Sequence, residues 1–274
     1  MAELIPAEFV FSQSNLQTFS HCRRQFLLRF VKRLVWPAQL VSDQSYVRDR
    51  EAGVRFHRLV HQYFLGFETP LLIQVAAADP DQRVLTWLEA FLSSPFASLE
   101  GHLQPETLFT TLLRDRPLSA KFDLLQINER TLKIYDWKTS RRLPNVSVLK
   151  KKVQSMVYPM VISRVLAVRD EMVNLESLTM VYWEANYPDQ PMEIVSRQED
   201  WEAFESNITA LIELILSLKE EEFIKTPEVR RCSWCEYRSY CYRGKTAGSL
   251  EENLEDSFLD DGIKIPGEIL DPWG

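Results

Sequence analysis

The stretch KFDLLQINERTLKIYDWK, residues 121–138, predicts a β-hairpin near the middle of the chain. Two apolar runs flank Asn128-Glu129-Arg130, and a short polar stretch between such runs is typical of a hairpin turn. If Asn128 pairs with Thr131, the antiparallel register places Asp123 directly opposite Asp136. Directly opposed residues have Cβ atoms about 5 Å apart. The sequence therefore predicts two carboxylates side by side on neighbouring strands.

Two carboxylates at that separation repel each other, so we expect a positive group beside them. Lys138 follows Asp136 by two residues, and strand alternation puts both on one face. Leu132 and Ile134 share that face, which should be partly buried, where an unpaired charge is costly. Two carboxylates and an amine suit a divalent-metal site, and oxygen ligands favour magnesium or manganese. The alternative is a surface hairpin with exposed charges.

Periodicity predicts further elements on both sides of the hairpin. A helix over 15–33, with Ser14 as its N-cap, precedes helices over 50–65 and 80–93. The expected strands and later helices are strand 106–113, helix 147–168 with a kink at Pro159, strands 178–184 and 192–197, and helix 199–221. The pattern predicts a mixed α/β fold, a central mixed sheet flanked by helices, with helical material at both ends of the chain.

The composition is that of a globular protein that buries a real core, with 45% hydrophobic and 26% charged residues. The start of the sequence, MAELIPAEFVFSQS, has no basic region followed by an apolar run, so it does not resemble a targeting signal. The longest apolar helical run, LIELILSL, is short and contains Glu213, which excludes a membrane span. We therefore expect a cytoplasmic protein that makes no use of a membrane.

The charge is distributed unevenly along the chain. Residues 246–274 carry a net charge equal to the −7 of the whole chain, so residues 1–245 balance to zero. We expect residues 1–245 to form one domain and the acidic residues 246–274 to form a flexible or partner-bound tail. Local basic runs suit either a phosphate backbone or solvated helix faces. They are Arg23, Arg24, Arg29, Lys32 and Arg33; Arg141 and Arg142; and Lys150, Lys151 and Lys152.

The chain has four cysteines, of which Cys232, Cys235 and Cys241 lie within ten residues and Cys22 stands far earlier. In a reducing cytosol such a set favours metal or cluster ligation over disulfides. Four thiolates hold either an iron–sulfur cluster or a tetrahedral zinc ion. Either group would join the first helix to the end of the fold.

Several motifs of this sequence resemble those of the PD-(D/E)XK nuclease superfamily, and their spacing is most similar to that of its RecB-like branch. Asp123 followed after thirteen residues by Asp136-Trp137-Lys138 resembles the superfamily core. The other matching motifs are Gly53-Val54-Arg55-Phe56-His57 (G-x-x-x-H), Glu106 on the preceding strand, and Gln154 with Tyr158 (Q-x-x-x-Y). The four cysteines resemble the split set of iron–sulfur members, which include CRISPR-associated exonucleases. The resemblance covers residues 12–243, and it departs where Ala120-Lys121-Phe122 stands in place of the glycine often found before the first aspartate.

The resemblance implies a restriction-endonuclease-like core with a helical, 4Fe–4S-bearing cap formed by both chain ends. It implies that His57, Asp123 and Asp136 hold Mg²⁺ or Mn²⁺, with help from the Trp137 carbonyl. Asp123, Asp136 and Lys138 would be catalytic, and Glu106 a supporting acid that need not ligate the metal. Gln154 and Tyr158 would contact the DNA backbone or support the lysine. Cys22, Cys232, Cys235 and Cys241 would hold the cluster, with structural zinc as the alternative.

The activity implied is a metal-dependent DNA exonuclease acting on single strands or ends, in DNA repair, recombination or CRISPR adaptation. The first alternative is a DNA-binding subunit that is active only within a helicase–nuclease or CRISPR-associated complex, to which the acidic tail would dock. The second alternative is a zinc-stabilised structural protein without activity. The sequence contains no G-x-x-x-x-G-K-[ST] motif, so unwinding of a duplex would require a helicase partner.

Overall fold

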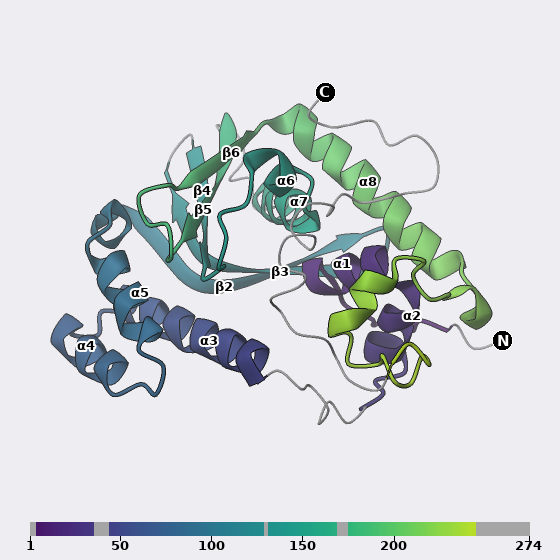
Figure 1. Cartoon of the computed structure of the whole chain (residues 1–274). Helices are drawn as coiled ribbons and strands as arrows, with labels where there is room; N and C mark the ends of the chain where they lie inside the picture. Colours follow the sequence, from purple (N-terminus) through teal and green to yellow (C-terminus); the bar gives the residue numbers. More distant parts are fainter. Residues whose placement is uncertain (1–3, 36–43, 129–130, 169–174, 245–274) are drawn as a thin grey trace.

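A six-stranded mixed sheet organises the chain (Figure 1). The computed structural model describes residues 4–35, 44–128, 131–168 and 175–244. The strands run in the order β1-β3-β4-β5-β6, and β2 pairs with β3. The β1–β3 and β4–β5 pairs are parallel and the others antiparallel. The strands are β1 (Phe11–Ser12), β2 (His102–Leu113), β3 (Arg116–Ile127), β4 (Thr131–Lys138), β5 (Ser177–Glu184) and β6 (Met192–Ser196).

The predicted hairpin register is confirmed. The Asn128 N–H donates to the Thr131 carbonyl at 3.0 Å, and β3 pairs with β4 from Ile127–Leu132 to Leu124–Tyr135. Asp123 and Asp136 occupy the next position along, where the backbone ladder has ended. Glu129 and Arg130 of the predicted turn lie outside the described residues.

Helices cover both faces of the sheet (Figure 1). On one face lie α1 (Gln13–His21) and α7 (Val153–Val168), and α8 (Gln198–Ser217) packs against α7. The opposite face packs against α3 (Gln44–Phe64), α4 (Thr69–Ala77) and α5 (Arg83–Leu92). The remaining helices are short: α2 (Arg23–Phe26), the π-helix η1 (Leu27–Val31), α6 (Val146–Lys150) and the 3-10 helices η2 (Pro95–Ser98), η3 (Glu220–Glu222) and η4 (Val229–Trp234).

The segment between the parallel strands β4 and β5 explains why α7 is apolar all round. Parallel neighbours need a crossover connection, and here α6 and α7 supply it. α7 lies between the sheet and α8, so residues on all of its sides are buried, including Gln154 and Tyr158. β5 is buried along nearly its whole length because both faces of the sheet are covered.

The prediction of one helix over 15–33 is wrong in two respects. The helix begins at Gln13 with Ser12 as its N-cap, because Ser12 and Asn15 form a reciprocal capping box. It ends at Cys22, whose backbone is extended (φ −159°, ψ 108°), before α2 and η1 continue. Cys22 therefore lies at a junction between two helices rather than on a helix face.

Other helices also differ from the sequence prediction. The helix expected over 147–168 is two helices, α6 and α7, with Lys151 and Lys152 between them, and α7 continues through Pro159. The helix expected over 199–221 ends at Ser217. α4 was not predicted; it is short, and Pro70 occupies its first turn.

The predicted tail, residues 246–274, lies outside the described part of the chain. Among the described residues, no helix is both long and apolar enough to cross a bilayer.

Candidate metal centre

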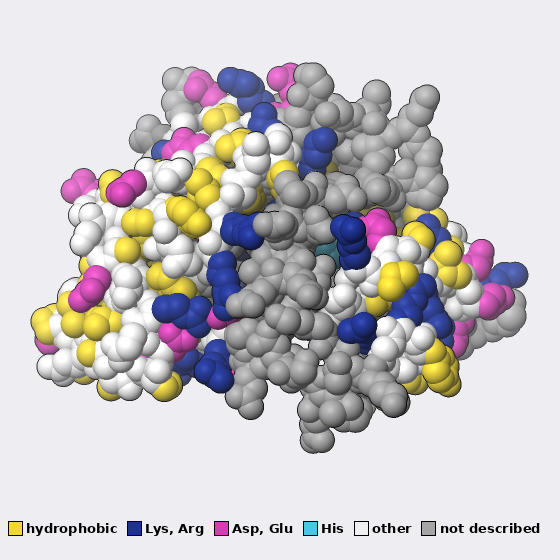
Figure 2. Space-filling view, viewed as in Figure 1, with side chains coloured by type: hydrophobic (Ala, Val, Ile, Leu, Met, Phe, Trp, Pro, Cys, Tyr) yellow, Lys and Arg dark blue, Asp and Glu magenta, His cyan; other side chains and the backbone are white. Residues whose placement is uncertain are grey.

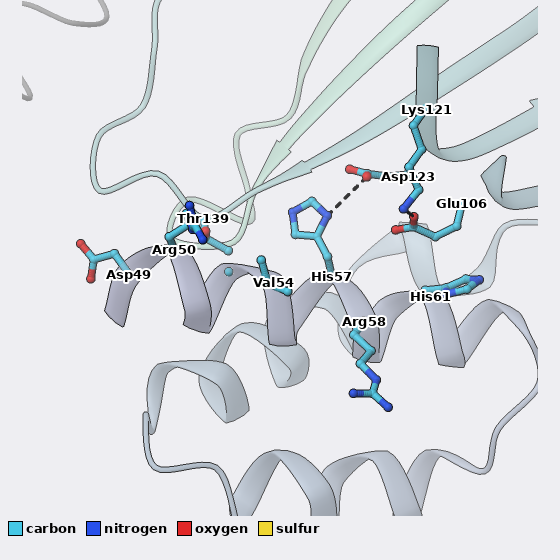
Figure 3. A pocket seen from close by; sticks show the side chains of 11 residues that line it. Asp49, Arg50, Val54, His57, Arg58, His61, Glu106, Lys121, Asp123 and Thr139 are labelled. Carbon is cyan, nitrogen blue, oxygen red and sulfur yellow. Dashed lines mark ion pairs between the residues drawn. The ribbon is translucent and has the colours of Figure 1, made fainter. Parts of the chain in front are cut away.

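His57 and Asp123 meet where α3 crosses the sheet (Figure 3). The Nδ1 atom of His57 lies 3.3 Å from Oδ1 of Asp123. The second oxygen of Asp123, Oδ2, accepts the Trp137 backbone N–H at 2.9 Å. Both oxygens of the carboxylate therefore have a fixed direction, one toward the helix and one toward β4.

Glu106 completes a three-residue group with this pair. Ligand atoms of His57, Glu106 and Asp123 all lie within 4.8 Å of one another, the only such His, Cys, Asp or Glu group that the described residues form. Glu106 has a left-handed backbone (φ 50°) inside β2, where the pairing with β3 skips from Pro105–Leu124 to Thr107–Phe122. Such strain in a non-glycine residue costs roughly 1–3 kcal/mol and often marks a functional position. Glu106 also forms an ion pair with Lys121.

Asp136 belongs to a second, adjacent group. Its side chain is nearly inaccessible, and its Oδ2 lies 2.6 Å from the Lys138 Nζ. Gln154 Nε2 donates to Oδ1 at 2.7 Å. Apart from the Lys138 ammonium, Asp136 Oδ2 has no hydrogen-bond donor in the described part of the chain. The predicted residues thus fall into two neighbouring groups, with Asp123 beside His57 and Glu106, and Asp136 beside Lys138 and Gln154.

The charges of the first group perturb each other. Burial lowers the pKa of His57, but the Asp123 carboxylate outweighs it, so this pKa lies above its ordinary value of 6.5. Burial raises the pKa of Asp123, but His57 and the Trp137 N–H outweigh burial, and this pKa lies below its ordinary value. Asp123 is therefore ionised at neutral pH, as a metal ligand must be.

Burial and the neighbouring charges both shift the pKa values of the second group. Burial raises the pKa of Asp136, and the Lys138 ammonium only partly offsets it, so this pKa stays above its ordinary value. Burial lowers the pKa of Lys138, but the two carboxylates outweigh it, so the amine stays charged. Tyr158 packs edge-on against Phe122 with ring centroids 4.9 Å apart. Burial raises its pKa, and so do the carboxylates of Asp136 and Asp123.

A pocket of about 580 Å³ opens over the first group. His57, Glu106 and Asp123 line it, together with exposed cations of α3 and β3 (Figure 3). These cations are Arg50, Arg58 and Lys121. The arrangement offers a nitrogen and several oxygens for a cation, with positive side chains around the opening for an anionic ligand.

The comparison with protein families gives the decisive finding. The model of the PD-(D/E)XK nuclease superfamily matches residues 10–242. The chain belongs to this superfamily. The mixed sheet with helices on both faces agrees with a PD-(D/E)XK core.

Comparisons with individual proteins are more distant. No curated protein matches the chain. Among solved structures, the protein SSO0001 is 17% identical with a TM-score of 0.46, and the match covers 87% of this chain and 89% of that one. A protein named "Putative exonuclease" from Eubacterium rectale is 11% identical with a TM-score of 0.49, and the match covers 88% and 90% of the two chains.

The donor set of the PD-(D/E)XK centre fits the divalent metal that such nucleases use. One imidazole and two carboxylates are ligands that Mg²⁺ and Mn²⁺ accept. Asp136 Oδ2, whose one polar neighbour among the described residues is the Lys138 ammonium, provides a further buried acceptor nearby. The metal site of this superfamily member is thus supported by the geometry of its own side chains.

Two residues of the PD-(D/E)XK site were not singled out from the sequence. Lys121 precedes Asp123 by two positions, and strand alternation already suggests a common face. Glu184 is buried at the end of β5 beside Lys138, and its Oε2 accepts the Ser140 N–H at 3.0 Å. An acidic residue ending the apolar run LTMVYW was the signal that could have identified Glu184.

The cysteines lie near one another at the junction of α1 and α2. Burial raises the pKa of Cys235 to about 12, and Cys22 and Cys241 add to the effect. Cys232 is buried and accepts a hydrogen bond from Arg243 Nη1 at 3.5 Å. The four thiols are free, and in the described residues no three sulfur atoms meet the 4.8 Å spacing of the His57 group.

Proposed function

We propose that this PD-(D/E)XK protein is a DNA exonuclease that needs Mg²⁺ or Mn²⁺ and acts on single strands or ends. The observation that carries the proposal is the convergence of His57, Glu106 and Asp123 in a cation-rimmed pocket beside Asp136 and Lys138. Superfamily membership supports phosphodiester hydrolysis as the chemistry.

Each side chain has a part in the proposed reaction. His57, Asp123 and Asp136 would hold the metal, and the position of Glu106 makes it a fourth candidate ligand. The bound ion would supply a hydroxide-like water and polarise a phosphate oxygen. Lys138 would stabilise negative charge that develops on the phosphate. Gln154 would hold Asp136 in place through its 2.7 Å hydrogen bond, and Tyr158 would support this face of the site.

The cysteines are proposed to hold a 4Fe–4S cluster, as in the RecB-like branch. Four thiols from both ends of the chain are a suitable donor set for a cluster, and equally for zinc. Iron, sulfide and zinc analysis of anaerobically purified protein distinguishes them. Stoichiometric iron and sulfide support the cluster; stoichiometric zinc without iron, from iron-replete cells, removes it.

A second candidate function is a DNA-binding subunit whose centre works only within a helicase or CRISPR-associated complex. The net charge of −7 on residues 246–274 favours it, because an acidic tail suits a basic partner. A cytoplasmic location, and a single domain over residues 1–245, remain predictions in either case. The zinc-stabilised protein without activity remains the third reading.

Degradation of end-labelled DNA by the isolated protein with Mn²⁺ tests the proposal. We expect activity that Asp136→Ala and Lys138→Ala each reduce by at least about a hundredfold, a loss typical of removing a group that stabilises charge in the transition state. Lys133→Gln is the matched control, because Lys133 lies on β4 outside the pocket, with its ammonium 3.7 Å from Glu193. Wild-type activity that survives both alanine substitutions indicates a contaminant; tight DNA binding without activity favours the complex-dependent subunit.

A further inference from the structure

A second pocket, of about 400 Å³, lies beside the cysteines and shares no lining residue with the metal centre. Three separate chain segments line it: Arg24 at the start of α2, Lys225 after η3, and Ser239–Tyr242. The Arg24 backbone N–H donates to the Ile224 carbonyl at 3.1 Å, which ties the first two segments together. The pocket is therefore part of the packed cap rather than an isolated loop.

Tyr242 is the most unusual residue of this pocket. Its side chain is 93% exposed, although large aromatic side chains usually bury their area. Its backbone is left-handed (φ 57°), a conformation that costs energy in a non-glycine residue. Its N–H donates to the Ser239 carbonyl at 3.1 Å, which helps to hold the turn. The fold thus holds a flat aromatic ring in solvent at an energetic cost.

Positive charge accompanies the ring. Lys225 Nζ lies 5.8 Å from the Tyr242 ring centroid and donates to the Cys241 carbonyl at 2.7 Å. Arg24 and Lys225 both act electrostatically on Cys241, so both lie near its sulfur. Neighbouring acids are already engaged elsewhere: Glu236 with Arg29, Glu220 with Lys32, and Glu228 with Arg231. Figure 2 shows Lys and Arg side chains at this α1–α2 end of the molecule, with Asp and Glu side chains among them.

We propose that this pocket binds an unpaired nucleotide of single-stranded DNA, with the base stacked on Tyr242 and its phosphate between Lys225 and Arg24. An exposed aromatic face beside cations is the combination that binds single strands without sequence preference. The site lies on the cap, so it would hold the strand at a distance from the scissile bond. The inference rests on the proposed DNA substrate and adds a second point of contact to it.

The competing explanation is electrostatic. Arg24 and Lys225 could serve only to balance the cysteine thiolates, in which case Tyr242 has no role in binding. The two explanations differ in what they predict for Tyr242→Ala, for the bound metal and for the salt dependence of DNA binding.

Fluorescence anisotropy with a labelled oligothymidylate and full-length protein, without added divalent metal, tests the site. Tyr242→Ala should raise the Kd for the oligonucleotide about fivefold to a hundredfold, which corresponds to the loss of one stacked base. Tyr242→Phe should restore the wild-type Kd. Lys225→Gln should reduce the slope of log K against log salt by about 0.7, one phosphate contact, whereas Lys133→Gln should not. Iron and zinc content should be unchanged in Tyr242→Ala, and so should hydrolysis of a thymidine 5′-phosphate aryl ester.

The outcomes are separable. Wild-type protein that binds no oligonucleotide overturns both this site and the proposed function. Wild-type binding with an unchanged Kd in Tyr242→Ala overturns the site alone. If Tyr242→Ala loses its bound metal, Lys225→Gln is the variant that tests the site. An unchanged slope of log K against log salt in Lys225→Gln then overturns the site.

Discussion

At the scale of single residues, the candidate metal centre depends on side chains that a strained backbone directs toward one another. Glu106 has a left-handed φ inside a strand, and Asp123 faces it where the β2–β3 pairing is interrupted. Because neither residue continues the ladder there, both carboxylates can approach His57. Lys121 forms an ion pair with Glu106, so an ammonium lies beside this group of ligand atoms.

The His57–Asp123 pair gives a pH prediction. In the metal-free protein the His57 pKa should lie above 6.5, because Asp123 outweighs the effect of burial. Its pKa is raised by folding, so the pair stabilises the fold below pH 6.5, and that stabilisation is lost as pH rises through the folded-state pKa. Asp123→Asn should lower the His57 pKa below 6.5, since burial then dominates. NMR titration of the imidazole measures this; a wild-type midpoint below 6.5 contradicts it.

At the scale of elements, the close approach of α3 to the end of β4 brings His57 over the sheet. A Cβ on Gly53 would lie 2.9 Å from Thr139 Oγ1, so only glycine fits without a shift. Asp49 adds to this contact, because its carboxylate pairs with Arg141 at 2.8 Å and Arg83 at 2.6 Å. These ion pairs connect α3 to the segment after β4 and to α5.

Gly53→Ala tests this contact. Alanine improves helix propensity by about 1 kcal/mol, but overpacking against Thr139 costs about 1–3 kcal/mol. We expect net destabilisation in urea unfolding and weaker Mn²⁺ binding as His57 moves from Asp123. In a Thr139→Ala background the same substitution should become neutral or stabilising, because the clashing atom is gone. Equal effects of Gly53→Ala in both backgrounds would show that Thr139 does not limit the approach.

A cluster of aromatic rings joins the two ends of the described chain. Phe223 is fully buried, stacks on Phe26 at 6.0 Å between centroids and meets Phe19 edge-on at 6.1 Å. It thereby attaches the segment before the clustered cysteines to α1 and α2. Phe223→Ala should cost about 3–5 kcal/mol of unfolding free energy. Phe67→Ala, whose ring is 47% exposed, should change it by less than about 0.5 kcal/mol. Similar losses in both variants would argue against this attachment.

At the scale of the whole molecule, the sequence predicted the mixed sheet and the register of the β3–β4 hairpin. It did not predict the local irregularities of the backbone. The hairpin register followed from two apolar runs and a short polar turn, and the apolar stripe of α8 followed from its periodicity. The break at Cys22 and the left-handed φ of Glu106 were not predictable, because tertiary contacts impose them on residues with no special propensity. The sequence placed Asp136 with Lys138, as the structure does, and its predicted part in the metal site beside His57 stays a prediction.

We infer that His57, Asp123 and Asp136, with Glu106 as a fourth candidate ligand, hold a catalytic divalent cation. Mn²⁺ titration of the full-length protein, followed by the electron paramagnetic resonance signal of free Mn²⁺, tests it most directly. We predict at least one Mn²⁺ bound per chain, with affinity reduced more than about tenfold by Asp123→Asn and unchanged by the exposed-edge control Glu193→Gln. Mn²⁺ binding that Asp123→Asn leaves intact, or no binding by the wild-type protein, would contradict the account.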